Sequence, residues 1–180
     1  MSSDDFSPLE DLDMGATVRG LRAGQKLLNR YTLKRILGRG GMGVVWLAYD
    51  ESLEREIAFK FLPETISHDR SAVDELKRET KQSLQLTHPH IVRIYDFVHD
   101  EQCAGLSMEY IEGDTLSNLR ADRPDKIFEV ADLELWVRQL CSALESAHED
   151  AELAHRDLKP ANLMIDKRGR LKIEIGRAHV

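Results

Sequence analysis

The chain has 180 residues, of which 42% are hydrophobic and 32% charged, with a formal net charge of −7. This composition is typical of a globular protein with one ordinary core, and the acidic balance argues against binding to nucleic acid or an anionic membrane. Cys103 and Cys141 show neither metal-ligand spacing nor a disulfide framework, which favours a reducing compartment. No apolar run is long enough to span a membrane. We therefore expect a cytoplasmic protein, and a membrane segment beyond residue 180 stays open.

The first half of the chain predicts a leader and then a sheet. Residues 1–29 are rich in Ser and Asp and lack hydrophobic periodicity, which predicts a flexible leader. Runs of strand-forming residues broken by glycines and turn residues then predict an opening meander and two later strands. These five strands are expected at residues 31–37, 44–49, 56–62, 91–97 and 105–110, with a helix at 71–86 between the third and the fourth.

The second half predicts mainly helix. An apolar stripe with i, i+3, i+4, i+7 spacing indicates a helix with one buried face, formed by Leu133, Trp136, Val137, Leu140, Leu144 and Ala147. Residues 163–165 and 171–173 flank a Lys-Arg-Gly turn and predict a hairpin. Strands followed by helices predict an α+β fold in two lobes.

Residues 38–45 read Gly-Arg-Gly-Gly-Met-Gly-Val-Val and fit the spacing G-x-G-x-x-G-x-V. Without a Cβ, glycines let backbone N–H groups approach phosphate oxygens closely. A glycine-rich hairpin turn is an equally good interpretation. A dinucleotide-binding fingerprint needs a helix after the glycines, whereas β-branched and aromatic residues follow here, so a strand–loop–strand arrangement is favoured.

Lys60 stands between Phe59 and Phe61 in a strand-like run. Burying a lysine is costly unless it is paired, and Glu79 on the following predicted helix is available as the partner, with Glu75 one turn earlier. An exposed lysine on an edge strand is the alternative.

Residues 155–162 read His-Arg-Asp-Leu-Lys-Pro-Ala-Asn. A solvated charged loop is the ordinary interpretation of such a run, but this many specified residues at fixed spacing rarely coincide by chance. The run resembles the catalytic loop of protein kinases, and the glycine loop and lysine lie upstream in the family's order. Lys159 at its position is typical of serine/threonine kinases, and the phrases around residues 40–43, 61–64 and 88–92 most resemble bacterial ones.

This resemblance implies a bilobal kinase-like fold, with a β-rich N-lobe and an incomplete helical C-lobe. It implies ATP and Mg²⁺ as cofactors and a protein serine or threonine hydroxyl as the substrate. The implied catalytic residues are Asp157 as the base, Lys159 on the transferring phosphate, Lys60 on the α- and β-phosphates and Glu79, preferred over Glu75 by its offsets, to fix that lysine; Asn162 is the implied magnesium ligand.

The resemblance also implies the nucleotide contacts. Gly38, Gly40 and Gly43 would cradle the phosphates, and Met108 would be the gatekeeper before a hinge whose backbone, at Glu109 and Ile111, would bond adenine. Apolar side chains would sandwich the base; the residues implied are Leu37, Val45, Ala58 and Met164. Ordinary core packing is the alternative for each apolar residue taken singly. Ser83 stands where the family more often has leucine.

The resemblance ends after residue 173. The family continues with Asp-Phe-Gly, whereas residues 174–180 read Glu-Ile-Gly-Arg-Ala-His-Val, which resembles the translated start of a common sequencing adapter. We therefore expect four parts: a leader at 1–29, an N-lobe and hinge at 30–111, a partial C-lobe at 112–173 and an artefactual tail at 174–180. The expected function is a serine/threonine protein kinase, present as an inactive fragment. The alternatives are a pseudokinase that binds nucleotide or acts as a scaffold, and a small-molecule kinase.

Overall fold

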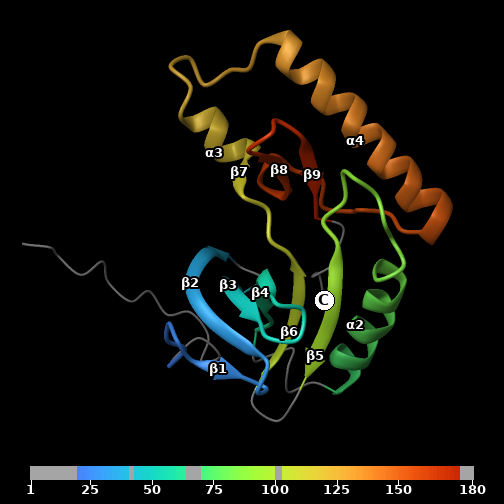
Figure 1. The fold of residues 1–180 in the computed structure, drawn as a ribbon. Helices are drawn as coiled ribbons and strands as arrows, with labels where there is room; N and C mark the ends of the chain where they lie inside the picture. The colour runs from blue at the N-terminus through green and yellow to red at the C-terminus, as the bar shows by residue number, and fades with distance from the viewer. Residues whose placement is uncertain (1–19, 41–42, 64–69, 100–102, 175–180) are drawn as a thin grey trace, which may run out of the picture.

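The computed structural model describes residues 20–40, 43–63, 70–99 and 103–174. These residues form two lobes joined by the segment after strand β6 (Figure 1). The predicted α+β, two-lobed architecture is confirmed.

The N-lobe is a six-stranded antiparallel sheet in the order β1-β2-β3-β4-β6-β5, with one helix beside β5 (Figure 1). Its elements are β1 (Lys26–Leu27), β2 (Tyr31–Gly40), β3 (Gly43–Asp50), β4 (Arg55–Phe61), helix α2 (Arg70–Ser83), β5 (Ile94–His99) and β6 (Ala104–Glu109). Leu76 attaches α2 to the sheet by packing with Leu62 and Ala104.

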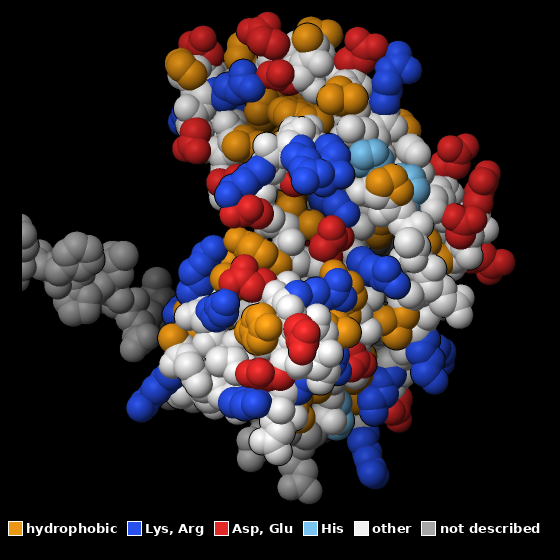
Figure 2. Space-filling view, viewed as in Figure 1, with side chains coloured by type: hydrophobic (Ala, Val, Ile, Leu, Met, Phe, Trp, Pro, Cys, Tyr) orange, Lys and Arg blue, Asp and Glu red, His pale blue; other side chains and the backbone are white. Residues whose placement is uncertain are grey.

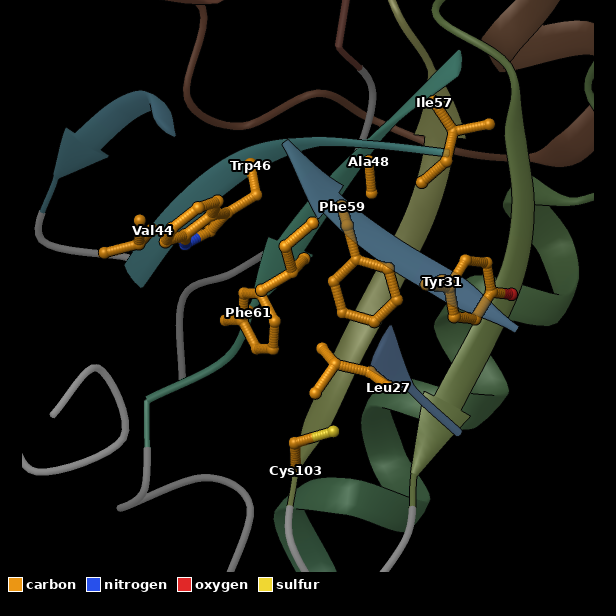
Figure 3. Packing of buried hydrophobic residues seen from close by; sticks show 10 residues of the cluster. Leu27, Tyr31, Val44, Trp46, Ala48, Ile57, Phe59, Phe61 and Cys103 are labelled. Carbon is orange, nitrogen blue, oxygen red and sulfur yellow. The ribbon is translucent and has the colours of Figure 1, made fainter. Parts of the chain in front are cut away.

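The side chains of strand β4 alternate between the two faces of the sheet. Successive side chains of a strand point to opposite faces, so Ile57, Phe59 and Phe61 share one face, whereas Ala58 and Lys60 share the other. The first face carries an apolar core in which Phe59 packs on Tyr31 and Phe61, with ring centroids 5.0 and 4.8 Å apart (Figure 3). Lys60 therefore points away from this core, which explains how a lysine is tolerated between two buried phenylalanines.

Gly105 of β6 allows this aromatic core to form. A Cβ at this position would lie 2.4 Å from Cε1 of the Phe59 ring and 2.9 Å from the carbonyl oxygen of Lys60. The glycine thus permits β4 and its largest buried side chain to approach β6.

The C-lobe contains a three-stranded sheet in the order β7-β8-β9 and two helices. Its elements are β7 (Gly113–Thr115), α3 (Leu116–Ala121), α4 (Val130–Ala151), a 3₁₀ turn at Pro160–Asn162, β8 (Leu163–Asp166) and β9 (Leu171–Ile173). The predicted hairpin at 163–173 is confirmed as β8 paired with β9. Helix α4 is attached to it by bonds from the Trp136 indole N–H to the Gly169 carbonyl (3.1 Å) and from the Leu171 N–H to Oε1 of Gln139 (2.8 Å).

The structure differs from the sequence predictions at several places, and strand β7 forms where no strand was expected. Residues 26–27 fall inside the predicted flexible leader but form β1 paired to β2, because Leu27 is buried in the N-lobe core; residues 1–19 lie outside the described part. The strand expected at 91–97 begins only at Ile94. The helix expected to reach residue 86 ends at Ser83. None of the helices in the described ranges is both long and apolar enough to cross a membrane.

The two lobes also meet away from the hinge. The N–H of Val92 donates to the carbonyl of Ile173, and the N–H of Ile173 donates to the carbonyl of His90, both at 2.9 Å. Strand β9 therefore pairs, through one parallel bridge between Ile91 and Ile173, with the segment that leads into β5. This bridge explains why Ile91 is not part of the antiparallel ladder.

Candidate nucleotide and phosphoryl-transfer site

An apolar cluster lies between the lobes. It contains the buried residues Ala58, Met108 and Ile111 and is joined by the partly buried Leu37, Val45 and Met164. These six come from β2, β3, β4, β6, the hinge and β8, so both lobes contribute. All six are residues predicted to surround adenine. Figure 2 shows that the surface is indented between the two lobes.

The same cluster contains apolar residues that the sequence prediction did not select, namely Val92, Ile94, Leu106, Leu84 and Phe97. These side chains continue the cluster toward β5 and α2. In the sequence they are ordinary members of apolar runs, so only their packing distinguishes them.

The glycine run forms the turn between β2 and β3, whose last paired residues are Gly40 and Gly43. Residues 41–42 lie outside the described part. Gly43 has φ +108°, and a Cβ there would lie 2.1 Å from the carbonyl oxygen of Phe61. Glycine is therefore required at this position both by its conformation and by the close approach of β4. At Gly38, by contrast, an added Cβ would meet nothing within 4 Å.

The side chain of Lys60 lies on the face of β4 that carries the apolar cluster, and Lys60 pairs with Val45 of β3. It is 11% exposed, and its Nζ lies 2.6 Å from Oε1 of Glu174. The sequence prediction missed this partner, because Glu174 stands 114 residues away and outside every motif of the family. The predicted partner Glu79 is on α2, but its side chain is not described, so this pairing stays a prediction. Glu75, the alternative, is exposed.

The run at 155–162 folds as a loop that ends in the 3₁₀ turn. Asp157 is held by its neighbours: Nζ of Lys159 lies 2.8 Å from its Oδ2, and Nδ2 of Asn162 donates to the same oxygen at 3.0 Å. Asn162 also donates to the backbone carbonyl of Asp157 at 2.8 Å. The three predicted residues are thus brought together by direct contacts. The Asp157 side chain remains 25% exposed, so a substrate can reach it.

The backbone of this loop is strained at one residue. Arg156 has φ +56°, a conformation that non-glycine residues rarely adopt and that is enriched at functional sites. On either side of it, His155 is buried and Asp157 donates its N–H to the His155 carbonyl at 2.7 Å. Nε2 of His155 is buried without a hydrogen-bond partner among the described residues.

Glu174 connects the two halves of the site. Its carboxylate pairs with Lys60 of the N-lobe, and its N–H donates to the carbonyl of Asn162 in the C-lobe at 3.4 Å. A continuous path of contacts therefore runs from Lys60 through Glu174 and Asn162 to Asp157. The ammonium predicted to bind phosphate and the carboxylate predicted to accept a proton belong to one polar network.

The residues present form a more complete site for a nucleotide than for Mg²⁺. A nucleotide base needs apolar surfaces on both sides, and its phosphates need a positive charge. The apolar cluster and the ammonium of Lys60 supply these two features. For Mg²⁺, which prefers carboxylate and water oxygens, Asn162 is the predicted ligand. Within the described ranges no group of three or more His, Cys, Asp or Glu side chains is arranged to hold a metal ion.

The comparison with known families agrees with this geometry. Residues 31–174 match the protein kinase domain family. The chain belongs to this family. The match covers both lobes and the predicted catalytic loop, and it includes β2 to β9.

The relatives that the chain matches include bacterial serine/threonine kinases. The chain is 36% identical over 151 residues to the serine/threonine-protein kinase PrkC of Bacillus subtilis, which covers 83% of this chain and 23% of that protein. It is 38% identical over 154 residues to PknB of Mycolicibacterium smegmatis, with 83% and 24% covered. The chain therefore spans about a quarter of the length of these relatives.

Solved kinase domains have the same fold. The kinase domain of PknI from Mycobacterium tuberculosis superposes with a TM-score of 0.78 at 28% identity, covering 87% of this chain and 61% of that domain. The predicted kinase-like fold with a β-rich N-lobe and an incomplete C-lobe is thereby confirmed.

Proposed function

We propose that this chain is the nucleotide-binding and catalytic-loop part of a serine/threonine protein kinase, which transfers the γ-phosphoryl group of ATP to protein hydroxyls. The observation that carries the proposal is the gathering of the six apolar residues from both lobes into one cluster, with Lys60 on the same face of β4. A flat apolar base fits between two such layers, and an ammonium at the edge fits its phosphates.

The hinge limits how adenine is bonded. The N–H of Glu109 already donates to the carbonyl of Arg93 at 2.8 Å. A hydrogen bond from Glu109 to the base therefore uses its carbonyl, which accepts from an exocyclic amine. The backbone of Ile111 supplies the second contact. Adenine presents its exocyclic amine at C6, where guanine has a carbonyl oxygen that cannot donate to the Glu109 carbonyl, so adenine is favoured over guanine.

In the transfer step, the substrate hydroxyl oxygen bonds to the γ-phosphorus as the bond to the ADP oxygen breaks, and the hydroxyl proton passes to Asp157. Lys159 and Asn162 hold the Asp157 carboxylate in a fixed orientation. Such general-base assistance contributes about 10²- to 10⁴-fold in rate. Lys159 also lies close enough to Asp157 to neutralise charge on the transferring group. Mg²⁺, when bound, neutralises the phosphates, and Asn162 is its proposed ligand here.

Lys60→Met tests the nucleotide proposal. We expect the affinity for ATP to fall by about tenfold or more, because charge-assisted bonds to phosphate contribute about 1.5–3 kcal/mol. The affinity for adenosine should not change, since adenosine has no phosphate. Both affinities are measured by calorimetric titration. Lys34→Met, which removes an exposed ammonium paired with Glu56, is the matched control. Equal losses for ATP and adenosine, or no loss for ATP, would contradict the proposal.

A second candidate function is nucleotide binding without catalysis. The observation that favours it is that the family continues after residue 173 through the magnesium-binding Asp-Phe-Gly, whereas residues 174–180 contain no aspartate and Gly176 arrives one residue before the family's glycine. We expect the 180-residue chain to bind ATP and to transfer no measurable phosphate from labelled ATP to a basic protein substrate. Measurable transfer that Asp157→Asn abolishes would exclude this candidate.

We also propose an N-lobe with hinge that ends at residue 111, a partial C-lobe at 112–173 and a tail at 174–180, with the protein in the cytoplasm; the leader boundary at residue 29 is not kept, because Lys26–Leu27 form β1 of the N-lobe. The sequence of the gene in genomic DNA across the codon for Ile173 tests the tail. Continuation into Asp-Phe-Gly supports an artefactual tail, and continuation through the codon for Val180 contradicts it.

A further inference from the structure

A partly buried ion pair joins the hinge to the C-lobe hairpin. Nζ of Lys172 in β9 lies 2.8 Å from Oε1 and 2.9 Å from Oε2 of Glu109, the last residue of β6. The Lys172 side chain is only 10% exposed, and that of Glu109 is 28% exposed. This contact therefore differs from the exposed pairs on the surface, because the Lys172 ammonium is largely removed from water and the Glu109 carboxylate partly so.

Glu109 is also fixed to the N-lobe by two further bonds. Its N–H donates to the carbonyl of Arg93, and the N–H of Arg93 donates to its Oε2 at 3.2 Å. The carboxylate thus accepts from an N-lobe amide and from a C-lobe ammonium at the same time. Its position is defined by both lobes together.

Each partner of the pair neighbours a member of the apolar cluster. Glu109 follows Met108 in β6, and Lys172 pairs across the hairpin with Met164 of β8. Met108 and Met164 are members of the cluster from opposite lobes. Holding Glu109 and Lys172 together therefore restricts how far Met108 and Met164 can move apart, and with them the two layers that are proposed to hold the base.

We infer that Lys172 is a positioning residue for nucleotide binding: through its partly buried ion pair with Glu109 it fixes the separation of the two lobes across the base pocket. This inference rests on the proposed function. Lys172 need not touch the nucleotide. A cleft held at its binding separation loses less conformational freedom when the base enters, and affinity rises accordingly.

The test compares Lys172→Met and Lys172→Arg with the wild-type full chain. Adenosine is the probe, because it reports on the base pocket without phosphate. We expect Lys172→Met to weaken adenosine binding on the order of tenfold, within the usual range of coupling between sites, and Lys172→Arg to recover most of it, because Arg also pairs with a carboxylate through two bonds. Lys34→Met, which breaks an exposed pair with Glu56, should leave the affinity unchanged.

A second measurement needs no nucleotide. Amide hydrogen exchange at Val92 and Ile173 reports on the backbone bonds between the lobes. Lys172→Met should accelerate exchange at both amides on the order of tenfold, and Glu109→Gln, which keeps the side-chain size, should do the same. Exchange at Phe59 in the N-lobe core should not change.

The outcomes separate the two proposals. Lower stability of Lys172→Met with unchanged adenosine affinity and unchanged exchange at Val92 and Ile173 would overturn the positioning role. A wild-type chain that binds no adenosine would contradict the proposed function instead, and the exchange rates then decide whether Lys172 holds the lobes together.

Discussion

The imidazole ring of His88 contacts its own segment before β5 and also helix α4 of the C-lobe. Its Nδ1 accepts from the N–H of His90 at 3.2 Å, and its Nε2 lies 3.2 Å from Oγ of Ser142 on α4. Nδ1 accepts only when it carries no proton, so the folded chain favours the neutral ring. Burial and then the neighbouring His90 and Lys172 lower the pKa of His88, with Asp150 acting in the opposite direction.

The lowered pKa of His88 predicts a pH-dependent stability. Below about pH 6.5, the ordinary value for histidine, the unfolded chain binds a proton at this site that the folded chain resists. The contribution of His88 to stability is therefore present above about pH 6.5 and is lost as the pH falls toward the lowered value. In urea unfolding between about pH 7 and pH 5, His88→Asn, which keeps an acceptor but does not titrate, should lose less stability than the wild type.

The control for this prediction is His148→Asn, at an exposed position near the end of α4. It should keep the full pH dependence of the wild type. An identical dependence in wild type and His88→Asn would show that the ring at His88 is not the titrating group.

At the scale of elements, the turn between β2 and β3 depends on Gly43. A Cβ there would lie 2.1 Å from the Phe61 carbonyl oxygen, and φ is +108°. We expect Gly43→Ala to lower the free energy of unfolding by about 1–3 kcal/mol, the usual cost of such strain. Gly38→Ala, where the added Cβ meets nothing within 4 Å, should change it by less than about 0.5 kcal/mol. Urea unfolding of both variants checks this, and equal effects would contradict the account.

Local patterns predicted most of these elements. The alternation in β4 and the turn residues of the 163–173 hairpin act over a few neighbours, and both elements form where expected. Strand β1 was missed, because two residues are too short for a period and form only by pairing with β2. Ile91 was predicted to belong to the strand that became β5, but it forms a parallel bridge with Ile173. The sequence did not indicate this bridge, because Ile173 lies far along the chain.

The candidate site likewise contains residues that a local pattern indicates and residues that it does not. Asp157, Lys159 and Asn162 were predictable because they share one short run with fixed spacing. The partner of Lys60 was not, since Glu174 reaches it from the other lobe. The pair of Glu109 and Lys172 likewise joins positions that are 63 residues apart. Ion pairs between distant segments leave no periodic signal in the sequence, so only the fold reveals them.

At the scale of the whole molecule, helix α4 exposes several apolar side chains at its surface. The predicted buried stripe is only partly buried: Leu133 and Val137 are 38% and 52% exposed, and Val130 at the start of the helix is 80% exposed. Figure 2 shows hydrophobic side chains at the surface of this lobe. Their spacing of three and four residues places them along one side of the helix, and such patches promote association.

We therefore expect the purified chain to self-associate at high concentration. Val137→Lys should weaken this association by about tenfold, because burying a valine contributes about 1.5 kcal/mol. Ala131→Lys adds the same charge at another exposed position of α4 and should have a smaller effect. Sedimentation velocity over a range of concentrations measures both. A wild-type chain that stays monomeric throughout would contradict this expectation.

The central claim is that a nucleotide base binds in the apolar cluster between the lobes. Methyl NMR spectra of the chain, recorded during a titration with adenosine, test it most directly. The account predicts shifts for Leu37, Val45 and Met164, which come from both lobes and line the cluster, and none for Leu27 in the core on the opposite face of the sheet. No shifts in the cluster at saturating adenosine, or shifts confined to other methyl groups, would contradict it.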